Sequence, residues 1–127
     1  IVGNDEEFGF MAGGIEKGLA KARELARTTA SIVIYKMGEK GAITITPTDE
    51  FRTGIYPVHA LKPTGAGDAF MAGLIASLAS GRALKESVLR GSACAAIVVS
   101  NVGCAPAMPN SDQLEQFLTD HPGVSAV

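Results

Sequence analysis

The chain has few cysteines and no long apolar run, and both absences narrow its class. Its two cysteines, Cys94 in an apolar helical run and Cys104 in the loop that follows, favour buried or half-buried free thiols over a disulfide or a metal pair. No stretch is apolar for the length of a transmembrane helix, and the first residues lack the basic-then-apolar layout of a signal peptide. We therefore expect a cytoplasmic protein without a membrane partner.

A surplus of one charge is also missing. The 127 residues include 11 basic and 13 acidic side chains, a net charge of −2, and the basic ones are scattered along the sequence. This distribution gives no electrostatic footprint for nucleic acid. Hydrophobic residues make up 46% and charged residues 19%, which excludes a disordered chain and suffices for a core without disulfides. The length predicts one domain at most.

Hydrophobic periodicity predicts helices mixed with strands, and hence a layered α/β arrangement. The helix over 67–78 is apolar nearly all round and should be buried, and Gly81 is expected to cap its end. The strand over 50–58 should face solvent, and capping residues should begin the last helix at Ser111. The expected segments are helices over 5–12 and 15–27, strands over 31–37, 42–46 and 50–58, and helices over 67–78, 84–100 and 111–118.

The stretch 62–70, Lys-Pro-Thr-Gly-Ala-Gly-Asp-Ala-Phe, carries the strongest chemical signal. Gly65 and Gly67 let backbone amides approach a ligand, and a helix that starts there offers unpaired N–H groups and the positive end of a dipole. Asp68 is an odd choice if the loop only holds an anion, but it fits a general base that deprotonates a nucleophile attacking that anion. The loop therefore predicts a phosphoryl-transfer site.

Structural alternatives exist for the same residues. For Asp68 the alternative is a purely structural role in the first turn of its helix, where carboxylates interact well with the dipole. The two glycines would also suit an ordinary tight turn, although a plain turn has no need of both.

The glycine loop resembles the C-terminal signature of the ribokinase/phosphofructokinase-B (PfkB) family of sugar kinases, Asp-Thr-x-Gly/Ala-Ala-Gly-Asp-x-Phe. Three further stretches fall in that family's order, so the resemblance covers essentially the whole chain. They are Asn-Asp-Glu-Glu at 4–7, Lys-Met-Gly-Glu-Lys-Gly at 36–41 and Val-Gly-Cys-Ala-Pro-Ala-Met-Pro at 102–109, and the loop itself matches at Thr64, Gly65, Ala66, Gly67, Asp68 and Phe70.

The resemblance implies a ribokinase-like fold and ATP-dependent phosphorylation of a sugar or sugar-acid hydroxyl, with ATP and Mg²⁺ as cofactors. Most sugar contacts and the lid belong to the family's first half. Residues 1–127 are therefore expected to be the C-terminal, nucleotide-binding part alone. We expect this part by itself to bind nucleotide weakly and to catalyse little.

Family roles carry over residue by residue. Asp68 would be the catalytic base, and Gly65, Ala66 and Gly67 would form an anion hole. The residues implied for nucleotide binding are Lys36, Gly38, Gly41, Thr64, Ser92, Ala96 and Gly103, and those implied for magnesium, acting through water, are Asn4 and Glu7.

Each of these secondary assignments has a structural alternative. Asn-x-x-Glu at 4–7 is also a capping box, and Gly38 and Gly41 are ordinary hairpin residues. Lys36 can snorkel from a strand end. Helices rich in alanine and serine, such as 84–100, are often just closely packed.

Lys62 departs from the family, whose usual aspartate at this position helps hold a monovalent cation. A lysine ammonium can take that electrostatic role itself, so a potassium requirement is in doubt. The Leu-Lys-x-x-Gly-Ala-Gly-Asp variant at 61–68, with Ala-Met-Pro at 107–109, resembles family members that act on a sugar acid.

Two other functions stay open. One is a non-catalytic nucleotide-binding or oligomerisation module that has kept the fold. The other is a family kinase for a nucleoside or a vitamin precursor. The expected partner is a small-molecule sugar or sugar acid, and a homodimer stays an open alternative.

Overall fold

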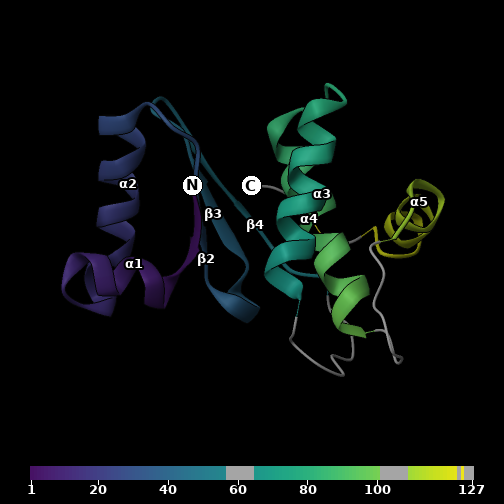
Figure 1. Ribbon diagram of the computed structural model, residues 1–127, viewed down its shortest axis with the longest axis horizontal. Helices are drawn as coiled ribbons and strands as arrows, with labels where there is room; N and C mark the ends of the chain where they lie inside the picture. The colour runs from purple at the N-terminus through teal and green to yellow at the C-terminus, as the bar shows by residue number, and fades with distance from the viewer. Residues whose placement is uncertain (57–64, 101–108, 123, 125–127) are drawn as a thin grey trace. The chain divides into compact units, whose positions relative to one another are not determined.

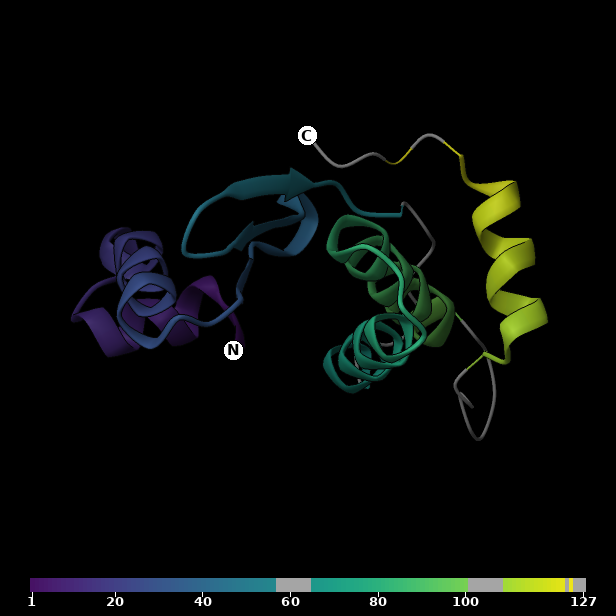
Figure 2. The same ribbon diagram turned by 90° about the horizontal axis from the view of Figure 1, so that it is seen from above.

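The computed structural model describes residues 1–56, 65–100, 109–122 and 124, with the side chain of residue 15 left aside. The chain forms two compact units, Ile1–Ile55 and Tyr56–Ser125. Figures 1 and 2 show that strands and helices both build the first unit, whereas the described part of the second is helical. The predicted α/β class is confirmed, and the division into two units is finer than the single domain expected from length.

The first unit is a small sheet with helices on one face. Its strand order is β1-β2-β3-β4, in which β1 and β2 are parallel and the other neighbours are antiparallel. In sequence order its elements are β1 (Val2–Asn4), α1 (Asp5–Ala12), the 3₁₀ turn η1 (Ile15–Lys17), α2 (Gly18–Thr29), β2 (Val33–Lys36), the 3₁₀ turn η2 (Gly38–Lys40), β3 (Ala42–Ile45) and β4 (Glu50–Thr53).

Alternate residues of the paired strands carry the core of this unit. Val33 lies opposite Ile45 and Tyr35 opposite Ile43, so all four project from one face of the sheet. These side chains pack with Phe8 of α1 and with Ala22 and Ala26 of α2. The small alanines let α2 lie close to the strands. The last residues of the parallel strands β1 and β2 are register partners, so they lie at the same end of the sheet.

The second unit is built on two long helices that lie side by side, α3 (Ala66–Ala79) and α4 (Leu84–Ser100) (Figures 1 and 2). Glycines allow the close approach. A Cβ on Gly91 would lie 2.8 Å from the Phe70 carbonyl oxygen, and one on Gly73 would lie 2.7 Å from Cys94 Sγ. A third helix, α5 (Ser111–Asp120), packs its Leu114 and Phe117 against the core of this unit.

Most expected segments are confirmed with shifted ends. The helix expected over 15–27 starts instead as the turn η1 and becomes α-helical only at Gly18. Gly81 ends α3 as expected: its φ is +88°, its N–H donates to Leu78 O, and the next N–H donates to Ser77 O, a Schellman motif. Helix α5 is capped one residue earlier than expected, by Asn110, whose Oδ1 accepts from Gln113 N.

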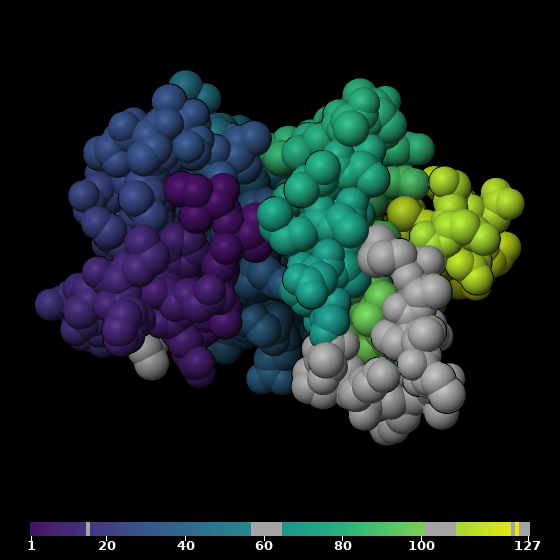
Figure 3. All heavy atoms as spheres, viewed as in Figure 1, coloured from purple at the N-terminus to yellow at the C-terminus, as the bar shows by residue number. Residues whose placement is uncertain are grey.

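Two expectations about burial were wrong. Helix α3 is not buried all round, because Met71, Ile75 and Leu78 are exposed along one side (α3 is teal in Figure 3). Strand β4 does not simply face solvent, since Phe51 and Thr53 are buried while its other two residues are exposed. Successive side chains of a strand point to opposite faces, so only one face of β4 is exposed to solvent. The overall polarity of the strand did not indicate its buried face. The part of the expected strand beyond Tyr56 lies outside the described residues.

Candidate active site

The glycine loop ends in a helix start that has no side-chain cap. Gly65 is the N-cap of α3, with φ +89°, and has no side chain to accept from the first-turn amides. The first helical bond of the ladder runs from Ala69 N to Gly65 O, at 3.0 Å. The N–H groups of Ala66, Gly67 and Asp68 therefore have no acceptor within the helix. Together with the helix dipole, these amides form a site suited to an anion.

The two glycines of the loop are needed for different reasons. Gly65 has a left-handed conformation that side chains rarely adopt. Gly67 has neither a positive φ nor any described atom within 4 Å of an added Cβ. A glycine inside a helix costs about 1 kcal/mol relative to alanine. Since neither backbone conformation nor packing within the described residues requires Gly67, close approach of a ligand accounts for it best.

Asp68 is the third residue of α3 and its side chain is exposed. Its carboxylate lies in the first turn, beside the uncapped amides that would hold an anion. An exposed carboxylate in this place can accept a proton from a group that approaches the same anion. Its position also suits the structural alternative, an interaction with the helix dipole.

In the first unit, polar residues gather where the parallel strands β1 and β2 end. Asn4 is the register partner of Lys36. Asn4 also caps α1: its Oδ1 accepts from Glu7 N at 2.7 Å, and Glu7 Oε1 accepts from Asn4 N at 3.1 Å. The capping box considered from the sequence is thus present. Carboxyl ends of parallel strands are the usual place for ligands in open α/β sheets, so a ligand role at this edge stays compatible with the cap.

The surroundings of Lys36 shift its pKa through two opposing effects. Burial lowers its pKa below the usual lysine value, and the nearby Glu7 carboxylate partly offsets this by raising it. A half-buried ammonium beside one carboxylate at a strand end can attract a phosphate group.

We expect Glu7→Gln to lower the Lys36 pKa further. The glutamine side chain still accepts from Asn4 N and so preserves the capping box, whereas the negative charge is lost. The measurement is an NMR titration of the Lys36 side chain in both proteins, and Glu16→Gln serves as a control that removes a different carboxylate, since the carboxylate that shifts the Lys36 pKa is that of Glu7. An unchanged or raised Lys36 pKa in Glu7→Gln would contradict the electrostatic contact.

Gly38 and Gly41 flank the turn between β2 and β3, as the hairpin alternative expects. Gly41 N donates to Gly38 O at 3.0 Å, and Met37 N donates to Gly41 O at 2.8 Å. A Cβ on Gly41 would lie only 2.0 Å from Thr53 O, so strand β4 alone requires a glycine there. Gly38 has φ +59° and nothing described within 4 Å of an added Cβ, which leaves its surface open to a ligand.

The two implied pocket residues on α4 differ in environment. Ser92 is half-buried, and Ala96 belongs to the core cluster of the second unit, as the close-packing alternative expects. Val98 of the same helix approaches Gly65: its Cγ1 would lie 3.6 Å from a Cβ there. No sequence pattern indicated this support of the loop. Thr64, Lys62, Gly103 and Cys104 lie outside the described residues.

The structure groups the predicted site residues in two sets. Gly65, Ala66, Gly67 and Asp68 belong to the second unit together with α4, and Asn4, Glu7, Lys36, Gly38 and Gly41 belong to the first. Within the described parts of the chain, no group of three or more histidine, cysteine, aspartate or glutamate side chains is placed to hold a metal ion. Nor is any helix in those parts long and apolar enough to traverse a lipid bilayer.

Known proteins resemble this chain along most of its length. Residues 1–111 match the pfkB family carbohydrate kinase family. A 5-dehydro-2-deoxygluconokinase of Photobacterium profundum is 39% identical over 123 residues, which cover 93% of this chain and 37% of that protein. The chain thus spans well under half the length of this curated relative.

Two crystal structures share its fold. A ribokinase of Thermotoga maritima superposes with a TM-score of 0.83 at 26% identity, over 93% of this chain and 41% of that one. A ribokinase II from Escherichia coli, in complex with ATP and Mg²⁺, has a TM-score of 0.81 at 25% identity, over 94% and 39% of the two chains. The ribokinase-like fold expected from the sequence motifs is confirmed, over about two fifths of the length of these two chains.

Proposed function

Because the family match covers residues 1–111, this chain belongs to the pfkB family of carbohydrate kinases, and we propose that it carries the ATP-binding, anion-hole and catalytic-base part of a kinase that phosphorylates a sugar or sugar-acid hydroxyl. The uncapped start of α3, with exposed Asp68 in its first turn, is the observation that supports this best. A cytoplasmic location fits the same proposal.

The chemistry follows from that arrangement. Asp68 accepts the proton of the substrate hydroxyl while its oxygen forms a bond to the γ-phosphorus of ATP. The bond between that phosphorus and the bridging oxygen of the leaving ADP breaks. The amides of Gly65, Ala66 and Gly67 donate to the oxygens on which negative charge accumulates. The proton ends on the Asp68 carboxyl, and the products are ADP and the phosphate ester.

Asn4 and Glu7 fit a magnesium ion only through water. The capping box engages Asn4 Oδ1 and Glu7 Oε1, which leaves the second carboxylate oxygen of Glu7 for a metal-bound water. Magnesium keeps several waters and needs few protein ligands, so this donor set is compatible with it. When bound, the ion would neutralise phosphate charge. The Lys36 ammonium, at the end of the neighbouring strand, would also attract the phosphate groups.

We place the substrate among the sugar acids. The relative from Photobacterium profundum is named for 5-dehydro-2-deoxygluconate, and a second, from Geobacillus kaustophilus, carries the same name at 37% identity. The Leu-Lys-x-x-Gly-Ala-Gly-Asp variant at 61–68 supports the same subgroup. A nucleoside or a vitamin precursor is the alternative substrate.

Lys62 makes potassium dispensable in this proposal. We expect turnover of the full-length protein to stay unchanged when potassium replaces a large organic cation in the assay buffer, because an ammonium already supplies the positive charge. Lys62→Asp is the matched variant, and its activity should respond to potassium. A strong potassium dependence of the unmodified protein would refute the assignment to Lys62.

Binding of Mg²⁺-ATP to the isolated chain tests the nucleotide part of the proposal. In a titration followed by amide NMR, the signals of Gly65, Ala66 and Gly67 should move most, with weak overall affinity. Magnesium chloride alone and adenosine with magnesium chloride are the controls, since neither carries the triphosphate. Signals of these three amides that stay in place at saturating Mg²⁺-ATP would contradict the anion hole.

A further inference from the structure

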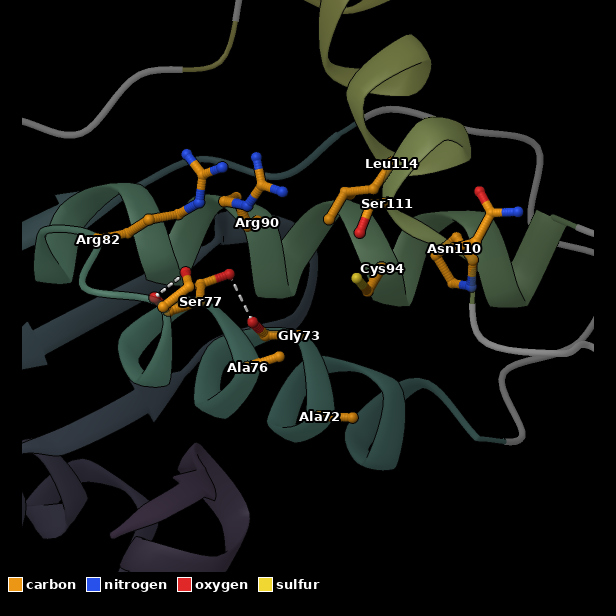
Figure 4. Close-up of a pocket in the computed structure, with 12 residues that line it drawn as sticks. Ala72, Gly73, Ala76, Ser77, Arg82, Arg90, Cys94, Asn110, Ser111 and Leu114 are labelled. Atoms are coloured by element: carbon orange, nitrogen blue, oxygen red, sulfur yellow. Dashed lines mark hydrogen bonds between the residues drawn. The ribbon is translucent and has the colours of Figure 1, made fainter.

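The second unit contains a cavity of about 250 Å³ between α3, α4 and α5 (Figure 4). Small residues of α3 make the room: Ala72, Gly73 and Ala76 line it, and larger side chains there would fill it. The cavity lies along the middle and the C-terminal end of α3, whereas the Gly65–Gly67 amides lie at the N-terminal end. The sequence motifs give no indication of this cavity.

Two arginines line the cavity. Arg90 is 7% exposed, and its buried Nε has no hydrogen-bond partner among the described residues. Its Nη1 donates to Glu115 Oε1, and Arg82 Nη2 lies 3.8 Å from the same carboxylate oxygen, while Arg82 Nη1 donates to Glu86 Oε1 at 2.6 Å. Both guanidinium groups therefore lie near one point, at one end of the cavity as Figure 4 shows. A buried N–H left unpaired is costly, which suggests that a bound group completes it.

Hydrogen-bond acceptors lie beside these donors. Ser77 Oγ donates to Gly73 O at 2.7 Å, and Ser80 Oγ donates to Ser77 O at 2.8 Å (the Ser77 bond is dashed in Figure 4). Because each hydroxyl donates its hydrogen to a backbone carbonyl, its oxygen can still accept a hydrogen bond from a hydroxyl of a ligand. The cavity thus combines charged donors for an oxyanion with neutral acceptors for alcohols.

We propose that this cavity binds a phosphate ester of a small polyol, its phosphate on Arg82 and Arg90 and its hydroxyls on Ser77 and Ser80. Guanidinium forks suit phosphate oxygens, and the unpaired Arg90 Nε supplies a donor that no described protein group uses. Without a ligand, Glu86 holds the guanidinium group of Arg82 and Glu115 holds that of Arg90, and both carboxylate charges oppose the phosphate. This site does not depend on the proposed kinase activity.

Titration calorimetry of the 127-residue chain with glycerol 3-phosphate tests the site. Glycerol and inorganic phosphate separate the contributions of the two ends, and sodium chloride at equal ionic strength controls for screening. We expect binding to weaken at least about tenfold in Arg90→Lys, which keeps the charge but loses the fork, and to strengthen in Glu115→Gln. Ala76→Leu, which fills the cavity, should abolish it. Arg27→Gln, an exposed arginine on α2, should leave it unchanged.

Several results would overturn the proposal. One is the absence of glycerol 3-phosphate binding to the unmodified chain. Another is equal binding in Arg90→Lys, Ala76→Leu and the unmodified chain, which would assign the phosphate to the Gly65–Gly67 amides instead. If Arg90→Lys fails to fold, the comparison of Ala76→Leu with Arg27→Gln decides. Binding of inorganic phosphate as tight as that of the ester would refute the role of the serines.

Discussion

Asp68→Asn in the full-length protein is expected to lower kcat by about 10²–10⁴-fold while ATP affinity is retained. Asparagine keeps the size and polarity of the side chain but cannot accept the hydroxyl proton. The residue lies exposed beside the uncapped amides of α3, so the substitution should not disturb packing. Steady-state kinetics with a direct nucleotide-binding measurement separates the two quantities.

Asp112→Asn is the matched control for this substitution. Asp112 also lies in the first turn of a helix, α5, where a carboxylate stabilises by about 0.3–1 kcal/mol through the dipole. If Asp68 acts only through the dipole of α3, both variants should lose a little stability and neither should lose turnover. A kcat of Asp68→Asn close to that of Asp112→Asn would therefore reject the general base.

Gly41→Ala is expected to reduce the free energy of unfolding by about 3 kcal/mol or more. Two effects add. Gly41 has φ +88° and ψ −142°, a region open almost only to glycine, and an added Cβ would overlap Thr53 O at 2.0 Å. The turn after β2 would have to move away from β4. Urea unfolding followed by circular dichroism measures the change.

Gly38→Ala provides the comparison for Gly41. Gly38 also has a positive φ, +59°, but an added Cβ meets no described atom within 4 Å. Its substitution should cost only about 1–2 kcal/mol, the ordinary price of the left-handed conformation. Equal destabilisation by the two alanines would mean that the contact with Thr53 O is not decisive. A larger loss of stability in Gly41→Ala than in Gly38→Ala would mean that the fold itself requires glycine at position 41, independently of any ligand.

Patterns confined to one segment were predicted well. Helix α4 has the expected ends, Leu84 and Ser100, and the alternative of a capping box at Asn4 and Glu7 is realised. Both depend on residues within a few positions of each other, which sequence spacing reveals directly. The glycine loop was likewise recognisable, because its motif is contiguous.

Features that depend on tertiary contacts were not predictable in the same way. The exposure of Ile75 on α3 depends on which side of an apolar helix meets α4, and an all-round apolar pattern cannot indicate that side. Gly41 is fixed by the backbone of Thr53, twelve residues away. Arg90 and Glu115 meet only once α5 packs beside α4. None of these three features can be recognised from residues that are close together in the sequence.

Phosphoryl transfer from ATP by the full-length protein is the most direct test of the proposed activity. The assay follows ADP formation and the phosphorylated product with 5-dehydro-2-deoxygluconate, ribose and a nucleoside as separate acceptors. We predict acceptor-dependent ADP formation that is fastest with the sugar acid and lost in Asp68→Asn. ATP binding without transfer to any of these alcohols would contradict it and favour a non-catalytic nucleotide-binding module.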